Sequence, residues 1–267
     1  MINFLRHHSG LKTAALLLPI FAVALFSSCS SPEKEKLQHV VRGKEYLNEK
    51  RYAEARIEFR SALKIDKKMP DAQFGLGEAA LALGFVQEAA EAYYEAMRID
   101  PDNLDARVRV GSLLAQYESE EGTKEAERLA NDVAQKNPNH IEGHVLMAEV
   151  RAAQKRWNDA QSEFQKAISL DPTRVETYLH QARYYERRAK SDVAQAQTFH
   201  AQAEQIFRQL LEKNPNTVGV RLAYGDFLFA NKRQAEAEQQ LLTANKADPK
   251  DKLVLVALRR YYETQER

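Results

Sequence analysis

Residues 74–101, FGLGEAALALGFVQEAAEAYYEAMRIDP, contain two apolar stretches with the spacing of amphipathic helices. In the first stretch apolar residues recur at helical intervals from Phe74 to Leu83, and in the second they do so from Ala89 to Met97. A proline preceded by an acidic residue closes the second stretch, and a residue before proline avoids helical dihedral angles. These residues therefore predict two helices joined as a hairpin.

The same pattern recurs along the chain. A dipeptide ending in proline closes each later copy: Asp100-Pro101, Asn137-Pro138, Asp171-Pro172, Asn214-Pro215 and Asp248-Pro249. These prolines fall 37, 34, 43 and 34 residues apart, and Asp66-Lys67 takes the corresponding place in the first copy. The sequence thus has a 34-residue period that is expanded twice.

A small and a large residue occupy fixed places in the second helix of each copy. Twelve residues before the closing position stands an alanine: Ala55, Ala89, Ala126, Ala160, Ala203 and Ala237. Four residues later comes a large apolar side chain in all copies but one, which has Ala130: Phe59, Tyr93, Phe164, Phe207 and Leu241. Alanine lets two helix axes approach, the larger side chain fills the widening gap, and stacked hairpins bury each other's faces. The pattern predicts an all-α superhelix of about six hairpins.

These positions resemble the tetratricopeptide repeat (TPR) family. The glycine of the family's first helix is present in four copies, as Gly43, Gly77, Gly111 and Gly225, and the family's tyrosine is present as Tyr46 and Tyr185. The resemblance implies an α-α superhelix with six TPR repeats over residues 36–250. It also implies a C-terminal capping helix over residues 251–267.

Two repeats are longer than the period. The third gains three residues around positions 117–122, which we expect to form a longer acidic turn. The fifth gains nine residues before Ala203 without any glycine or proline, which predicts longer helices with Ser191 or Asp192 capping the second one. The tip of that hairpin is basic and is either a partner contact or simply solvated: Arg187, Arg188 and Lys190.

The N-terminal residues have the layout of a secretory signal peptide. An apolar run over residues 13–26 is shorter than a bilayer-spanning helix, and Pro19 interrupts it. Ser27 and Ser28 then precede Cys29, the only cysteine in the chain. This arrangement resembles the lipobox of bacterial lipoproteins, although Phe26 stands where that motif usually has leucine.

The lipobox resemblance implies a signal peptide over residues 1–28, a lipidated Cys29 and a tether over residues 29–35. The alternatives are an ordinary cleaved signal peptide with an incidental cysteine, or an uncleaved anchor. Ser30 resembles the outer-membrane sorting pattern of enteric-type bacteria, so we expect the periplasmic face of the outer membrane.

Composition and motifs argue against several other classes of function. The formal net charge is only +1, without the excess of basic residues typical of nucleic-acid binding. His140 and His144 are four residues apart, but no third histidine or cysteine accompanies them, and no H-E-x-x-H or phosphate-loop motif occurs. We therefore expect no metal, no cofactor, no small-molecule substrate and no enzymatic activity.

In the TPR family the first helices of successive repeats line a concave groove that holds an extended segment or a helix of a protein partner. The matching positions here are Val40, Lys44, Leu47, Phe74, Glu78, Leu81, Val108, Glu149, Arg183, Asp226 and Phe229. The apolar members also belong to the packing of the fold, whereas nothing about the packing requires the charged members, so these are the better candidates for partner contact. Apolar residues occupy the places where a carboxylate clamp needs polar donors, which disfavours that mode of binding.

The chain resembles TPR lipoproteins associated with exopolysaccharide export and exosortase loci. Pilotins of type IV pilus secretins, which are also TPR lipoproteins, are an alternative resemblance. Both imply a lipid-anchored scaffold or adaptor that faces the periplasm. A regulator of peptidoglycan synthases or hydrolases is a second possibility of a different class.

Overall fold

The computed structural model describes residues 31–117 and 119–265. In this part of the chain all regular structure is helical: α1 (Pro32–Asn48), α2 (Tyr52–Ile65), α3 (Pro70–Ala82), α4 (Val86–Ile99), α5 (Leu104–Gln116), α6 (Glu120–Lys136), α7 (Ile141–Ala153), α8 (Trp157–Leu170), α9 (Val175–Ser191), the 3-10 helix η1 (Val193–Gln195), α10 (Ala196–Lys213), α11 (Val218–Ala230), α12 (Gln234–Ala247) and α13 (Lys252–Thr264). The predicted all-α superhelix of six hairpins and a final helix is confirmed. None of the described helices combines the length and hydropathy needed to cross a bilayer.

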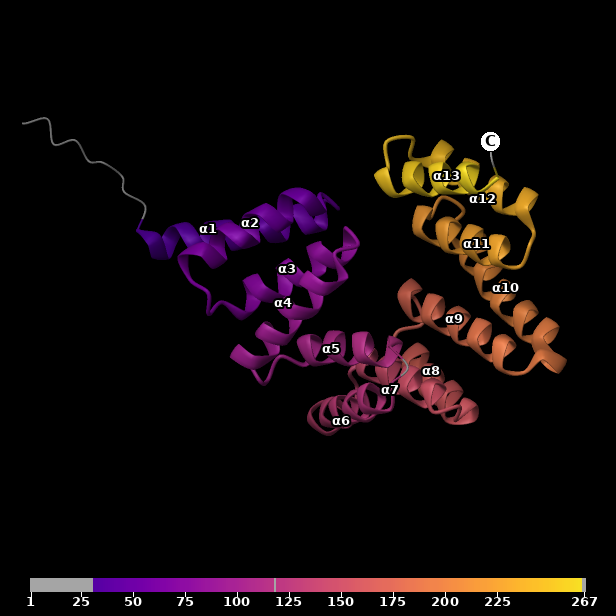
Figure 1. The fold of residues 1–267 in the computed structure, drawn as a ribbon, viewed down its shortest axis with the longest axis horizontal. Helices are drawn as coiled ribbons and strands as arrows, with labels where there is room; N and C mark the ends of the chain where they lie inside the picture. Colours follow the sequence, from indigo (N-terminus) through magenta and orange to yellow (C-terminus); the bar gives the residue numbers. More distant parts are fainter. Residues whose placement is uncertain (1–30, 118, 266–267) are drawn as a thin grey trace, which may run out of the picture.

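The hairpins stack into a strongly curved superhelix (Figure 1). Each odd-numbered helix packs against the even-numbered helix that follows, and the first helices α1 and α3, α5 and α7, α7 and α9, and α11 and α13 also contact one another. Residues 49–54 and 82–83 of the first two repeats line one cavity of about 310 Å³ together with residues 248 and 250–253 near the C-terminus. The curvature therefore brings the two ends of the repeat array together.

The predicted small and large residues form the core. The six repeated alanines are fully buried, and the large side chains that follow them are no more than 4% exposed. Gly43 and Gly75 lie against the ring of Phe59, where an added Cβ would come within 2.7 and 2.3 Å of ring carbons. Glycine is therefore required at these two positions because the helix backbones pack directly on an aromatic ring.

In the third repeat the large side chain beside the glycine comes from the next repeat. Its Ala130 is too small to fill the space beside Gly111, and Leu146 of α7 occupies that space instead. Leu146 is fully buried. The next repeat thus supplies the large side chain that this copy lacks.

Two boundary predictions are corrected. Helix α1 begins at Pro32, where the Ser31 hydroxyl accepts a hydrogen bond from the Lys34 amide, so residues 32–35 are helical and not tether. The extra residues of the third repeat lengthen α6 to 17 residues and do not form a longer turn. The Ser119 side chain caps α6 by accepting from the Gly122 amide, which stabilises helix at an acidic segment whose charges favour a helix N-terminus.

The predicted longer helices of the fifth repeat are confirmed, but the predicted cap is not at the start of the second one, because α10 begins after Gln195, whose side chain makes no capping hydrogen bond. Helices α9 and α10 have 17 and 18 residues, and Asp192 caps η1 by accepting from the Gln195 amide. The final helix α13 buries Val254 and Tyr261, whereas Leu253 and Leu255 are half exposed. The predicted signal peptide and Cys29 lie outside the described residues.

Candidate functional site

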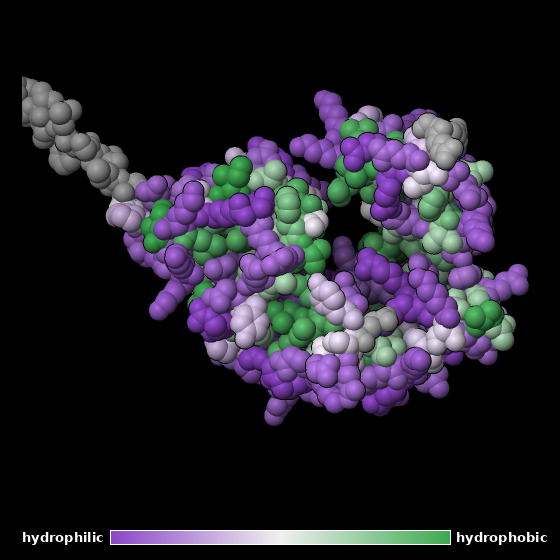
Figure 2. Space-filling view, in the orientation of Figure 1, coloured by the Kyte–Doolittle hydropathy of each residue, from purple (hydrophilic) through white to green (hydrophobic). Residues whose placement is uncertain are grey.

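The inner face of the superhelix is the candidate site. A hollow opens between the N-terminal and C-terminal repeats in the space-filling view, with apolar and hydrophilic residues mixed around it (Figure 2). Two pockets lie between first helices: a central pocket built from α5, α7 and α9, and a terminal pocket between α11 and α13. Each holds residues that the sequence predicts for the groove.

The central pocket has a volume of about 290 Å³. Its lining residues come from three successive first helices and from α8: Ala115, Gln116, Glu149, Ala152, Phe164, His180, Arg183, Tyr184 and Arg187. The Oε1 atom of Glu149 lies 2.7 Å from Nδ1 of His180, while its Oε2 atom is buried without a hydrogen-bond partner. Arg183 is exposed beside it. The pocket is thus bordered by one buried acceptor without a partner and by one exposed cation.

The terminal pocket has a volume of about 310 Å³ and brings together Asp226 and Phe229. Arg260 of α13 lies 2.5 Å from the Asp226 carboxylate, and Phe229 packs edge-on against Tyr261. This pocket is mostly apolar, and the charge of its one carboxylate is already balanced.

The apolar residues predicted for the groove divide into two sets. Val40 and Val108 are 6% and 4% exposed and belong to the core, so they are corrected to packing residues. Leu47 and Phe74 are half-buried, and Leu81 is the most accessible at 36% exposure. Val40 and Val108 are buried because a residue on the inner face of the superhelix can still direct its side chain into the seam between two helices.

Four of the five charged residues predicted for the groove form salt bridges within the chain. Lys44, Glu78, Glu149 and Asp226 each pair with a residue on the next first helix: Asp71, Arg109, His180 and Arg260, respectively. Each pair joins two neighbouring repeats; the Glu78 and Glu149 pairs are partly buried, whereas the Lys44 and Asp226 pairs are exposed and contribute little to stability. Only Arg183 has no salt bridge to a described residue.

Sequence reasoning missed the partners Arg109, His180 and Arg260. A signal for them was present, since each lies 31 or 34 residues after its acidic partner, close to one repeat length. A search for opposite charges one period apart would have found them.

The predicted basic tip of the fifth repeat is only partly exposed. The Arg188 guanidinium lies over the Phe199 ring at 4.3 Å from its centroid and donates a hydrogen bond to the Tyr184 hydroxyl at 3.3 Å. Arg187 is half-buried and lines the central pocket, and Lys190 is exposed. Arg188 therefore holds α9 to α10 and is not part of the exposed tip.

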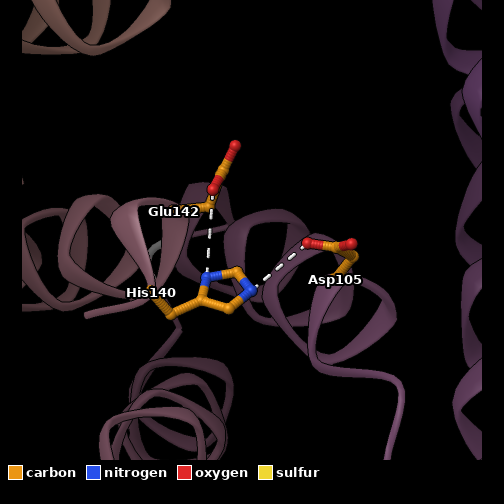
Figure 3. A group of neighbouring side chains, drawn as sticks. All are labelled: Asp105, His140 and Glu142. Atoms are coloured by element: carbon orange, nitrogen blue, oxygen red, sulfur yellow. Dashed lines mark ion pairs between the residues drawn. The ribbon is translucent and has the colours of Figure 1, made fainter. Parts of the chain in front are cut away.

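Three side chains with metal-binding chemistry meet at the junction of α5 and α7 (Figure 3). The Nε2 atom of His140 lies 3.3 Å from Asp105, and its Nδ1 atom lies 3.9 Å from Glu142. That same Nδ1 accepts the Gly143 amide as the N-cap of α7, and Glu142 is paired with Arg174. A hydrogen bond with Asp105 raises the pKa of His140. His140 Nδ1 and the Glu142 carboxylate, two of the atoms that could bind a metal, already have partners within the chain. We therefore interpret the cluster as an ion-pair junction between repeats.

The two closely spaced histidines do not form a common site. His144 has Nδ1 at 2.7 Å from Glu163 of α8 and donates from Nε2 to the Pro138 carbonyl oxygen at 2.8 Å. His140 instead faces α5. Each imidazole ties its helix to a different neighbour.

Comparison with known proteins agrees with this architecture. Residues 33–178 match the family model described as "Cytochrome c-type biogenesis protein H TPR domain", and residues 194–260 match one described as "Tetratricopeptide repeat". A TPR repeat-containing protein of Treponema pallidum is 28% identical over 199 residues, which are 64% of this chain and 23% of the relative. The human mitochondrial import receptor subunit TOM70 is 24% identical over 145 residues, which are 53% of this chain and 24% of the relative. The chain thus spans about a quarter of the length of both.

Solved structures share the fold at low sequence identity. A TPR protein from Parabacteroides merdae superposes with a TM-score of 0.63 at 16% identity and covers 87% of this chain and 86% of its own. The pilF protein of Pseudomonas aeruginosa gives a TM-score of 0.50 at 18% identity over 88% and 98% of the two chains. Since a single TPR family model matches more than half of its residues, this chain belongs to the tetratricopeptide repeat family.

Proposed function

We propose that this protein is a lipid-anchored TPR scaffold of the bacterial envelope that holds a segment of a protein partner in its concave groove. The observation that carries the proposal is the central pocket, where the buried Oε2 of Glu149 has no partner and Arg183 is exposed beside it.

An unpaired buried acceptor costs free energy until a donor reaches it. A peptide supplies N–H donors and carbonyl acceptors at regular intervals, so one bound segment satisfies Glu149 and Arg183 together. The apolar walls formed by Phe164 and Tyr184 suit the side chains between those polar groups. We expect an extended segment or one face of a helix, and a binding role without catalysis.

The anchoring part of the proposal rests on Cys29 and on where α1 starts. Only Ser30 and Ser31 separate Cys29 from the first helical residue, Pro32. The three Cα–Cα steps from Cys29 to Pro32 span at most roughly 11 Å. A lipid on Cys29 would therefore keep the first repeat directly at the membrane surface, on the periplasmic side of the outer membrane as we propose.

The groove is tested by photo-crosslinking in native membranes. A photoreactive residue placed at Arg183 is expected to capture a discrete partner, whereas one at Tyr94, which is 55% exposed on the second helix α4, is not. Arg183→Glu should weaken capture without lowering helicity, since exposed substitutions usually cost less than about 0.5 kcal/mol. Capture at Tyr94 but not at Arg183 would move the site away from the concave face.

The anchor and the pathway are tested separately. Cys29→Ser should move the protein from the membrane fraction to the periplasm, and continued membrane association would refute the lipid anchor alone. Exopolysaccharide export or secretion and pilus machinery is the proposed setting, so deletion should reduce polysaccharide export or abolish secretin multimers. If both persist while peptidoglycan synthase or hydrolase activity changes, the alternative role as a regulator of those enzymes is the correct one.

A further inference from the structure

A second groove adjoins the central pocket at the edge of the superhelix. It has a volume of about 460 Å³ and is formed by the ends of α5, α7 and α9 and the start of α8. Its lining residues are Gln116, Ala152, Ala153, Lys155, Trp157, Arg187, Lys190 and Ser191. The two expanded repeats, the third and the fifth, flank this edge groove, and the fourth repeat forms its centre.

Every charged residue that lines the edge groove is basic. Lys155 and Lys190 are exposed, and neither forms a salt bridge with a described residue, while Arg187 lies between them and the central pocket. Of the nearby carboxylates, Asp192 caps η1 and Asp159 pairs with Arg156, while the half-buried Glu186 interacts electrostatically with Lys190. The exposed lining of the groove thus carries two lysine side chains, Lys155 and Lys190, and no carboxylate.

The edge groove also has an apolar component. Trp157 is half-buried and packs against Tyr184 with the ring centroids 6.1 Å apart. The Tyr184 hydroxyl donates to the Trp157 carbonyl oxygen at 2.9 Å, which fixes the start of α8. Next to the groove in sequence stand Tyr117 and Val193, which at 71% and 81% are the most exposed large apolar side chains among the described residues.

We propose that the edge groove is a second docking surface, which binds an acidic protein segment carrying an aromatic or aliphatic residue. Acidic side chains of the segment pair with Lys155 and Lys190, and its apolar residue packs on Trp157. Gln116, Ala152 and Arg187 line both this groove and the central pocket, so the two surfaces are continuous. This inference is independent of the proposed role of the concave groove.

Binding in the edge groove can be followed by intrinsic tryptophan fluorescence, because Trp157 is the only tryptophan in the sequence. The experiment titrates purified protein with a short synthetic peptide of glutamates and aspartates that contains one phenylalanine and one leucine. We expect a saturable change in tryptophan fluorescence and an affinity that falls as salt rises. The double variant Lys155→Glu with Lys190→Glu should weaken binding by about tenfold or more, because like charges then face each other.

A matched control uses lysines at the equivalent turns of other repeats. Lys50 and Lys232 have the same left-handed backbone as Lys155, with φ of 57°, 63° and 58°, and they lie outside the groove. Lys50→Glu with Lys232→Glu should leave peptide affinity unchanged. An equal loss in this control, or an equal fluorescence response to polyphosphate, would show unspecific attraction and overturn the proposal, as would the absence of a saturable response. Peptide affinity that falls in the Lys155→Glu, Lys190→Glu variant but not in Arg183→Glu assigns the peptide to the edge groove, so the two proposals fail separately.

Discussion

Arg109 on α5 binds Glu78 on α3 through both carboxylate oxygens. Its Nε atom lies 2.7 Å from Oε1 and its Nη2 atom 3.0 Å from Oε2, and the Tyr93 hydroxyl donates to Oε1 at 2.7 Å. Three helices from two repeats thus meet at one carboxylate. Glu78 is therefore a clamp between repeats, although its sequence position matches a groove contact.

Glu78→Gln is expected to lower the free energy of unfolding by about 1–2 kcal/mol, because it weakens a bidentate charged pair and a buried tyrosine's hydrogen bond. The loss of stability is not larger because Arg109 is partly exposed and water screens its charge. Urea unfolding measures it. Glu45→Gln, at an exposed position of α1, serves as the control, and an equal loss there would argue against the clamp.

Two glycines should respond oppositely to alanine. At Gly75 the added Cβ would lie 2.3 Å from the fully buried Phe59 ring, so Gly75→Ala should cost about 1–3 kcal/mol of stability. At Gly225 the nearest atom is a Leu241 methyl at 3.2 Å, and the gain in helix propensity of about 1 kcal/mol offsets the contact. Gly225→Ala should therefore be neutral or stabilising. Thermal unfolding of both variants compares them, and a stable Gly75→Ala protein would contradict the ring packing.

Stability at acidic pH should depend on Glu204 of α10. Hydrogen bonds from Arg233, and then from Tyr224 and Arg208, lower the pKa of Glu204 to about 2 despite its partial burial. A carboxyl group with a depressed pKa stabilises the fold above its unfolded value of about 4.5, and this contribution is lost as pH falls toward 2. A shift of this size is worth at most roughly 3 kcal/mol, and contact with water reduces it to about 1–2 kcal/mol.

Glu204→Gln is the corresponding variant. Its deficit in the free energy of unfolding should be full at pH 7 and should shrink between about pH 4.5 and pH 2. Glu212→Gln on the same helix is the control, because Glu212 is exposed and forms no salt bridge with a described residue. A deficit that is the same at pH 7 and pH 2.5 would mean that packing, not the charge, is lost.

The two ends of the superhelix should separate when salt is added. Tyr52 and Glu54 at the start of α2 share a cavity with Asp251 and Lys252 of the C-terminal turn. A backbone hydrogen bond and Arg51 lower the pKa of Glu54, and the charge of Lys252 adds to this. Spin labels at Ala53→Cys and Leu253→Cys, in a Cys29→Ser background, should report a short distance at low salt and a longer one at high salt.

Charge reversal provides the control for this closure. Glu54→Lys should open the ends at low salt, and adding Lys252→Glu should close them again. If the distance between the two spin labels changes neither with salt nor with these charge reversals, the curvature is fixed by the repeat packing alone.

The local sequence determined the helices, the hairpins and the seam between them. Alanine at the close contact, Phe59 and its counterparts one turn later, and the proline that ends every repeat but the first act over a few residues, so spacing alone reveals them. The lengthened helices of the fifth repeat followed from the lack of glycine and proline. The third repeat was harder, because an acidic stretch suits either a turn or a helix N-terminus, and the cap at Ser119 decided for the helix.

Only the tertiary structure decided which inner-face residues are free. Val108 and Glu78 occupy groove positions in sequence, yet one is buried and the other is paired with Arg109, while Arg183 stays exposed. The edge groove around Trp157 likewise depends on three turns that are far apart in the chain. Helix formation depends on neighbours three and four residues away, whereas exposure and pairing depend on the small rotation between successive hairpins. That rotation accumulates over six repeats and is set by packing across every seam at once.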